Sequence, residues 1–265
     1  MNINKIIATM LAAGLLVSGA AGATEKPVIA FTPKQEARIG EIAKDYLLAH
    51  PEVLVEVSQK LRFQQQEKQQ LAMKTAIIQN QAALLSDKGT PSYGPTDAKV
   101  TVVEFFDYQC IYCARLAPEL EKVIKANPYV RFVFKEFPIF GQRWPASLSA
   151  AKTGLQVWKQ KGGDAYLQYH NALYATGHNE GKLTDGDIST AAKAVKFDAK
   201  AAPDVQGALD GINTLAQQLG LNGTPALVVL PSVGASTDNV TVIPGYTSAE
   251  TLQQVIHHVA GDTKK

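Results

Sequence analysis

The sequence VVEFFDYQCIYC occupies residues 102–113 and decides the fold that we expect. Residues 100–106 are mostly β-branched or aromatic on both faces, as in a buried central strand. A helix is predicted from the two cysteines to about Ala126, and residues 130–134 form a second apolar run. Strand, helix and strand at this spacing predict a right-handed βαβ unit.

The chain holds 2 cysteines, Cys110 and Cys113, and both lie in this segment. A disulfide between them closes a very small loop and adds little stability through chain entropy. We therefore interpret the pair as a redox switch that passes disulfides to other proteins. Cys110 falls at the strand-to-helix junction, where unpaired N–H groups and the helix dipole stabilise a thiolate. We expect Cys110 to be the exposed nucleophile with a lowered pKa, and Cys113 to be the shielded, resolving thiol.

A zinc half-site is the alternative interpretation of the same two cysteines. A structural zinc site requires about four protein ligands. The chain has 5 histidines, but they offer no second spaced pair of ligands. We therefore expect no metal, and no cofactor apart from the redox-active disulfide. His170, on the apolar face of a predicted helix, is expected to be a packed, hydrogen-bonded side chain.

The N-terminus predicts export. Lys5 precedes an apolar run of about twelve residues, which is too short for a bilayer that needs roughly twenty. Residues 21–23 read Ala-Gly-Ala, which fits a signal-peptidase site. We predict a signal peptide over residues 1–23, cleaved near Ala23, and a periplasmic location. The formal net charge of +2 argues against nucleic-acid binding, which requires a strong basic surplus.

Residues 24–89 are predicted to be a helical oligomerisation region. Thr32 and Gln35 form a capping-box pattern, and His50-Pro51 separates this first helix from a second that continues towards Leu85. Apolar residues recur at helical spacing between Ile39 and Leu61 on otherwise polar helices. Such a stripe either lies on the catalytic domain or forms a subunit interface. We favour the interface, and expect a homodimer.

The remaining chain is predicted to be one α/β domain with an insertion. Residues 89–97 are rich in Gly, Pro, Ser and Thr and read as a linker. The domain begins with residues 90–142 and resumes with residues 220–265, which hold two further predicted strands. Between them, residues 143–219 are almost entirely helical, far beyond an ordinary connection.

This chain resembles the thioredoxin-fold disulfide oxidoreductases of the DsbA family. The likeness lies in residues 102–113, in Lys135-Glu136-Phe137-Pro138 and in Gly223-Thr224-Pro225. It implies a thioredoxin-like fold with an inserted helical subdomain and a periplasmic thiol:disulfide oxidoreductase. The implied partners are unfolded or misoxidised exported proteins and a DsbB- or DsbD-like membrane redox partner. The N-terminal region is similar in placement to the dimerisation regions of DsbC and DsbG.

The resemblance also assigns residues that bind the substrate. Thr224 and Pro225 match the family's cis-proline loop, which faces the cysteines and pairs with the substrate backbone. Ile111 and Tyr112 form the interior of the Cys-x-x-Cys motif and are expected to contact the substrate.

Glu104 is a candidate proton relay. Val102 and Phe106 share its face of the strand, so its carboxyl should be buried and its pKa raised unless it has a partner. The resemblance places the relay near Cys113 and makes Lys135 a possible charge partner of Glu104. The alternatives are a solvent-facing glutamate and a lysine that is merely solvated at a strand end.

Two departures from DsbA bear on the direction of the reaction. The motif interior has no histidine, and the residue before Pro225 is Thr224, as in DsbC and DsbG. Both favour mixed oxidase and isomerase behaviour over strong oxidation. A dedicated isomerase or reductant is a second hypothesis. A chaperone or interaction module with incidental cysteines is a third.

Overall fold

The computed structural model describes residues 31–261. The predicted signal peptide therefore lies outside the described residues. The chain divides into two compact units, Met1–Leu61 and Arg62–Lys265. None of the helices in residues 31–261 combines the length and the apolar character that a membrane span requires.

The first unit holds helix α1 (Pro33–Ala49) and the beginning of α2 (Glu52–Gln79). Thr32 and Gln35 form the predicted capping box, and the helix ends before His50. No residue of α1 is buried. Its apolar stripe and the one on early α2 are 48–58% exposed at Ile39, Ile42, Tyr46, Leu54, Val57 and Leu61. The described chain alone therefore leaves this stripe uncovered.

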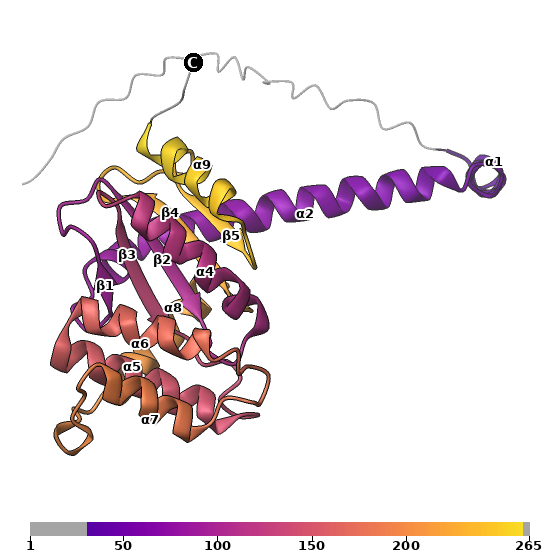
Figure 1. Ribbon diagram of the computed structural model, residues 1–265. Coiled ribbons are helices and arrows are strands. Elements are labelled where there is room, and N and C mark those ends of the chain that lie inside the picture. The colour runs from indigo at the N-terminus through magenta and orange to yellow at the C-terminus, as the bar shows by residue number, and fades with distance from the viewer. Residues whose placement is uncertain (1–30, 262–265) are drawn as a thin grey trace, which may run out of the picture. The chain divides into compact units, whose positions relative to one another are not determined.

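The second unit is built on a five-stranded sheet of order β1-β3-β2-β4-β5 (Figure 1). The strands are β1 (Ser92–Tyr93), β2 (Val100–Phe106), β3 (Arg131–Glu136), β4 (Ala226–Pro231) and β5 (Thr241–Pro244). β2 and β3 are parallel and joined by α4 (Ile111–Ala126), as the predicted βαβ unit requires, and the other neighbours are antiparallel. Every residue of β2 is buried, and each large apolar side chain so buried contributes about 1.5–3 kcal/mol.

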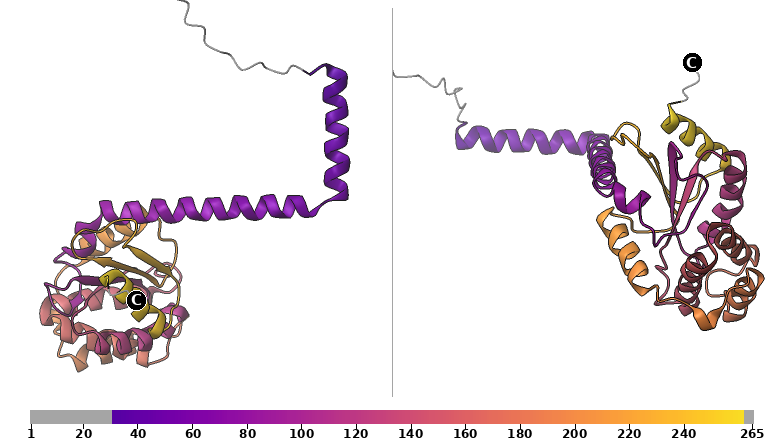
Figure 2. Two further views of the ribbon diagram at one scale, coloured as in Figure 1. Left: turned by 90° about the horizontal axis from the view of Figure 1, so that it is seen from above. Right: turned by 90° about the vertical axis from the view of Figure 1, so that its left-hand side faces the viewer.

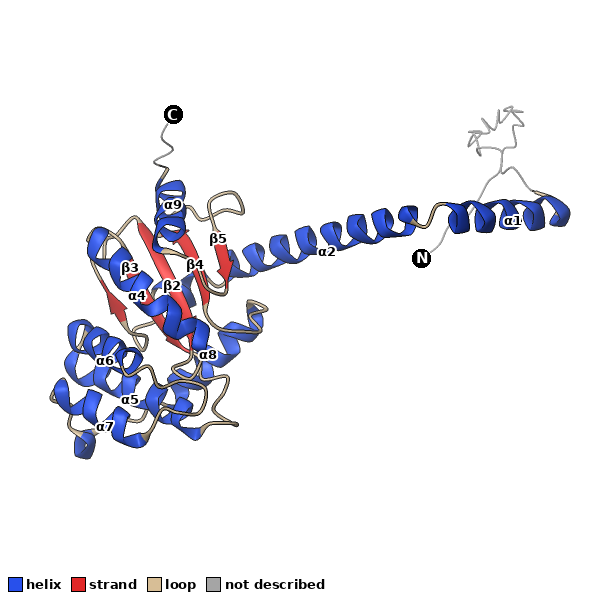
Figure 3. Ribbon diagram, turned by 45° about the vertical axis from the view of Figure 1, so that its right-hand side comes forward, coloured by secondary structure: helices blue, strands red, loops and turns tan. Residues whose placement is uncertain are grey.

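Helices cover both faces of this sheet (Figure 2). One core contains Val102 and Phe106 with residues of α4, α5 (Pro145–Lys161), α6 (Gly163–Ala175), α7 (Asp185–Ala194) and α9 (Ala249–Ala260). The other contains Val103 and Phe105 with residues of α3 (Gln81–Leu85) and α8 (Gln206–Gln218). A short 3-10 turn, Ala199–Ala201, precedes α8. The thioredoxin-like α/β fold with added helices is thus present, and Figure 3 shows the sheet behind α4.

Two boundaries differ from the sequence prediction. The predicted insertion 143–219 ends in α8, whose Ile212 and Leu215 pack with Val103 on the face of the sheet away from α4. The predicted N-terminal region 24–89 is divided at Leu61, because the apolar residues that follow belong to the second unit. Ile77 and Leu84 are fully buried in the same core as Val103.

Two local details also differ. The second helix does not run unbroken to Leu85, because α2 ends at Gln79 and α3 begins at Gln81. The predicted linker 89–97 contains the edge strand β1, which pairs with β3.

Candidate active site

Cys110 lies at the N-cap of α4. Its thiol donates to the carbonyl oxygen of Thr224 at 3.2 Å. The Cys113 thiol is the main cause that lowers the pKa of Cys110 to about 6, because it hydrogen-bonds the Cys110 sulfur. Thr224 and the backbone N–H groups of Tyr112 and Cys113 lower it further, against the opposing effect of burial. A substantial fraction of Cys110 is therefore thiolate at neutral pH.

The structure corrects the expected exposure of Cys110. Its side chain is 4% exposed, and that of Cys113 is 0% exposed. The loop that carries Thr224 lies against the Cys110 sulfur and covers it. Burial raises the pKa of Cys113 well above its usual value. Cys110 is more exposed than Cys113, as expected, but the difference is small. A client cysteine must therefore approach the Cys110 sulfur closely to react with it.

Thr224 and Pro225 are joined by a cis peptide bond. Pro225 accepts a hydrogen bond from the N–H of Gly245 at 2.8 Å, which ties the loop to the end of β5. The Thr224 hydroxyl is buried and has no hydrogen-bond partner while Cys110 is a thiol. It is therefore available to donate to the Cys110 thiolate. Ile111 is half-buried, and Tyr112 is 52% exposed beside the cysteines.

Glu104 lies on β2 beneath the cysteines and is 2% exposed. Neither of its carboxylate oxygens has a hydrogen-bond partner. Burial raises the pKa of Glu104 to about 8, and the charge of Cys110 adds to the rise. Glu104 in turn raises the pKa of Cys113. A buried carboxyl that is poised near neutral pH is suited to exchanging a proton with the resolving thiol.

The expected pairing of Lys135 with Glu104 is wrong. In the parallel register of β2 and β3, Glu104 is opposite Phe134, so Lys135 points to the other face of the sheet. Its ammonium donates to Ala83 O at 2.9 Å and to Thr90 Oγ1 at 2.8 Å. It also pairs with the Asp87 carboxylate at 3.3 Å. Lys135 is 1% exposed and fastens α3 and the linker to the sheet.

A second buried carboxyl, Glu136, was not predicted from the sequence. It is 1% exposed and accepts hydrogen bonds from Tyr108 at 3.1 Å and from Tyr166 at 2.9 Å. Burial raises its pKa well above the usual value, although both tyrosines lower it. The alternation of the strand could have predicted this carboxyl. Glu136 follows Phe134 by two residues and so shares its face of the sheet, and Phe134 is opposite Glu104.

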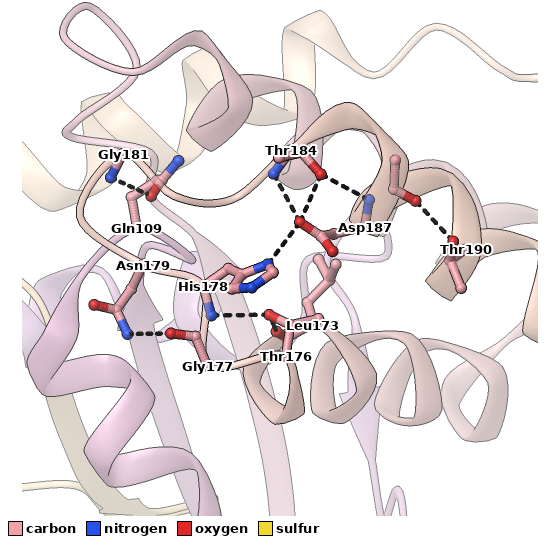
Figure 4. Close-up of polar contacts among 11 residues, drawn as sticks. Gln109, Leu173, Thr176, Gly177, His178, Asn179, Gly181, Thr184, Asp187 and Thr190 are labelled. Carbon is pink, nitrogen blue, oxygen red and sulfur yellow. Dashed lines mark hydrogen bonds and ion pairs between the residues drawn. The ribbon is translucent and has the colours of Figure 1, made fainter.

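Buried contacts tie the Cys-x-x-Cys turn to the inserted helices. Asp107 accepts from the Ser147 hydroxyl at 2.7 Å and from the Phe140 N–H at 2.9 Å. The Gln109 side chain accepts from the N–H of Gly181 at 2.8 Å, in the loop between α6 and α7 (Figure 4). That loop is thereby held next to Cys110.

His170 lies in the aromatic cluster behind this turn. It is 1% exposed, its ring is 5.0 Å from that of Phe106, and its Nδ1 lies 3.0 Å from Asn171 Oδ1. Burial lowers its pKa to about 4. Within residues 31–261, no group of three or more His, Cys, Asp or Glu side chains is arranged to hold a metal ion.

Residues 86–233 match the family described as Thioredoxin, and residues 35–69 match the Copper resistance protein ScsC N-terminal domain. BcfH of Salmonella enterica Typhimurium is 46% identical, with 85% of this chain and 96% of that chain covered and a TM-score of 0.75. The chain belongs to the thioredoxin family of thiol-disulfide oxidoreductases.

Further proteins similar to this thioredoxin-family oxidoreductase include other proteins of disulfide chemistry and of the ScsC type. A linker-deletion variant of ScsC from Proteus mirabilis is 27% identical, with 88% of this chain and 99% of that chain covered and a TM-score of 0.62. Disulfide bond formation protein D of Bacillus subtilis strain 168 is 34% identical over 93 residues, which are 34% of this chain and 40% of that protein. The alignments with curated relatives span 15–40% of the length of those proteins.

Proposed function

We propose that this oxidoreductase forms and isomerises disulfides in exported proteins, in the periplasm. The observation that carries the proposal is the Cys110 thiol, which lies 3.2 Å from the cis-proline loop and whose pKa is lowered to about 6. A thiolate of that kind attacks disulfides at neutral pH and also leaves readily from a mixed disulfide.

In the oxidising direction, a client thiolate attacks the Cys110 sulfur of the Cys110–Cys113 disulfide. A client–Cys110 disulfide forms, and Cys113 leaves as a thiolate. With its raised pKa, Cys113 then takes a proton, which the neutral Glu104 carboxyl is placed to supply. A second client thiolate attacks the client sulfur of the mixed disulfide, and Cys110 leaves as its stabilised thiolate. The client loses two electrons, and the pair of cysteines gains them.

In the isomerising direction, the Cys110 thiolate attacks a wrong client disulfide. The client thiolate that is released attacks another disulfide of the same client, which frees a different client thiolate. That thiolate attacks the client sulfur of the client–Cys110 disulfide, and Cys110 leaves as its thiolate. No net electron transfer occurs, so the protein must already be reduced. We propose that a DsbB- or DsbD-like membrane partner sets which state is present.

The periplasmic location is supported by the signal-peptide pattern and by the relatives. A protein described as a periplasmic thioredoxin-like protein from Salmonella enterica Typhimurium is 27% identical to this chain, with a TM-score of 0.57. Self-association is supported by the uncovered apolar stripe between Ile39 and Leu61, which lies entirely within the ScsC N-terminal match. We propose that this stripe joins copies of the chain, with a homodimer as the simplest assembly.

The test uses scrambled ribonuclease A, whose activity returns only when its disulfides are rearranged. The reduced full-length protein is expected to restore that activity, and the oxidised protein to oxidise reduced ribonuclease A. Cys110→Ser should abolish both reactions. If the reduced protein does not restore activity, the isomerase part of the proposal is wrong, and if the oxidised protein does not oxidise the thiols, the oxidase part is wrong.

A holdase is the second candidate, because the exposed apolar stripe could bind unfolded chains. Cys110→Ser combined with Cys113→Ser separates the two functions. Suppression of aggregation that survives in this variant, without thiol exchange, would favour the holdase.

A further inference from the structure

A groove with a volume of about 820 Å³ lies between the second half of α2 and the cis-proline loop. The groove is lined from α2 by Gln66, Gln69, Gln70, Met73 and Lys74, and from the other side by residues 220–226, by β5 and by Gly245. Its volume falls in the range of about 300–1,000 Å³ that is typical of ligand sites. Thr224 and Pro225 belong to this lining, and the Thr224 carbonyl oxygen lies 3.2 Å from the Cys110 sulfur, so the groove borders the loop that contacts Cys110.

One face of α2 packs against the rest of the second unit at its C-terminal end and borders this groove further towards its N-terminus. Gln66, Gln70, Met73 and Ile77 follow one another at helical spacing and so share a face. Ile77 is fully buried in the core, and the Lys74 ammonium donates to Thr237 O at 2.7 Å, which fixes this part of the helix against the sheet. A face that served packing alone would continue with apolar residues. Here it continues with side-chain amides that border the groove.

The opposite wall of the groove includes β5, whose outer edge has backbone N–H and C=O groups that no other strand of the described chain pairs with. β5 is an edge strand, and no other strand in the described chain pairs with its outer side. The Gly245 N–H donates to Pro225 O at 2.8 Å, and Ala226 is opposite Pro244. Hydrogen-bonded and non-bonded pairs alternate in an antiparallel ladder, so the backbone N–H and C=O of Val242 face away from β4. An extended chain can add to such an edge through main-chain hydrogen bonds.

We propose that this groove binds an extended segment of the client polypeptide, adjacent to the client cysteine that reacts with Cys110. The inference rests on the proposed function, because the occupant is its client. The Thr224 carbonyl oxygen is 3.2 Å from the Cys110 sulfur, so a chain whose cysteine reaches Cys110 lies next to the cis-proline loop, which also lines the groove. Glutamine amides both donate and accept hydrogen bonds, as peptide groups do. α2 would thus contribute to client binding as well as carrying the N-terminal region.

The test compares two double variants of the full-length, oxidised protein. Gln66→Ala with Gln70→Ala removes two amides from the groove. Gln64→Ala with Gln79→Ala changes the opposite face of the same helix and is the matched control. All four side chains are exposed and alanine favours helix, so both variants should fold.

Two dithiols serve as probes, a short uncharged peptide with two cysteines and dithiothreitol. Each reduces the Cys110–Cys113 disulfide to two thiols and is itself oxidised to a disulfide. The measured quantity is the ratio of the rate constant for the peptide to that for dithiothreitol. We expect the ratio to fall about tenfold in the groove variant, since each lost hydrogen bond corresponds to a factor of about three to ten. The control variant should keep the ratio of the unaltered protein.

An unchanged ratio in the groove variant would overturn the groove as a client site. A stronger perturbation is Gln70→Trp, which fills the groove, and a ratio unaffected by it would have the same meaning. If the groove variant instead changes the number of associated protomers, the occupant is a second copy of the chain and the proposal is wrong. Absence of exchange with dithiothreitol as well as with the peptide, in the unaltered protein, would contradict the proposed function itself.

Discussion

The Cys110 thiol and the Thr224 carbonyl oxygen lie 3.2 Å apart, although 114 residues separate them in the sequence. The motif turn and the cis-proline loop therefore make one site. The same threonine holds a buried hydroxyl that lowers the pKa of Cys110. Thr224 thus covers the nucleophile and also sets its ionisation.

Thr224→Val should raise the pKa of Cys110 from about 6. Valine keeps the branched shape but removes the hydroxyl donor, and a hydrogen bond to a charged group is worth about one pKa unit or slightly more. The measurement is the rate of alkylation of the reduced protein as a function of pH. Mass spectrometry of peptides from the protein gives the extent of alkylation at Cys110 and at Cys113 separately. Thr224→Ser retains the hydroxyl and should leave the midpoint unchanged. Faster labelling of Cys113 than of Cys110 would reverse the roles assigned to them.

Glu104→Gln should change how stability depends on pH. The pKa of Glu104 is raised from 4.5 to about 8 in the folded protein. The folded state therefore holds this proton more tightly than the unfolded state, and stability is lost as the pH rises from about 4.5 to 8. The loss amounts to about 3 kcal/mol between pH 4.5 and pH 7. Glutamine does not titrate, so the variant should gain on the unaltered protein across that interval.

Urea unfolding of both reduced proteins between pH 4 and pH 9 measures this effect. The difference in unfolding free energy between the two proteins at low pH, where Glu104 is protonated in both states, measures the pH-independent cost of burying the amide. Subtracting it from the difference at each higher pH leaves the effect of Glu104 ionisation. A difference that stays constant with pH would show that Glu104 is not the buried, neutral carboxyl described above.

Lys135→Met should destabilise the protein without altering the nucleophile. Methionine lacks the ammonium that donates to Ala83 of α3 and to Thr90 and that pairs with Asp87. We expect a loss of about 2 kcal/mol, because buried acceptors are left without a donor while one partner is partly solvated. The pH profile of Cys110 alkylation should stay unchanged. A shifted profile would give Lys135 a role in the redox site that its position on the other face does not explain.

Lys135 also shows what could be read from the sequence. The alternation of Phe132, Phe134 and Glu136 already separates Lys135 from these residues and places it on the opposite face. This alternation does not give the register between β2 and β3. The register pairs Glu104 with Phe134 and so determines which side chains neighbour Glu104. Relative register is a tertiary property, so the partner of Lys135, Asp87, was not predicted.

Local signals predicted other features well. The capping box at Thr32 and the strand of residues 100–106 appear where the sequence placed them. The exposure of Cys110 was misjudged because the covering loop lies far along the chain. The division at Leu61 was missed because the second helix was predicted to continue towards Leu85 within one N-terminal region, whereas its later residues Ile77 and Leu84 complete the core of the second unit.

Self-association should depend on the exposed stripe of α1 and early α2. Ile42 and Leu61 are each 53% exposed, so aspartate at both positions should leave the fold intact while disfavouring burial of the stripe. Light scattering should give a mass of two protomers for the unaltered mature chain and of one for Ile42→Asp/Leu61→Asp. Glu41→Asp combined with Lys60→Arg is a control that conserves charge on the same helices. A monomeric unaltered chain would contradict the proposal.

The redox potential should lie below that of DsbA. The pKa of Cys110, about 6, falls between the ~3.5 of DsbA and the ~7 of thioredoxin. A less stabilised thiolate means a less stabilised reduced state, so the disulfide is a weaker oxidant than DsbA at roughly −120 mV. Equilibration of the full-length protein with glutathione buffers measures the potential, with Cys113→Ser as a control that forms only mixed disulfides with glutathione. A value at or above that of DsbA would show that Thr224 and the Ile111-Tyr112 pair do not tune the site as argued.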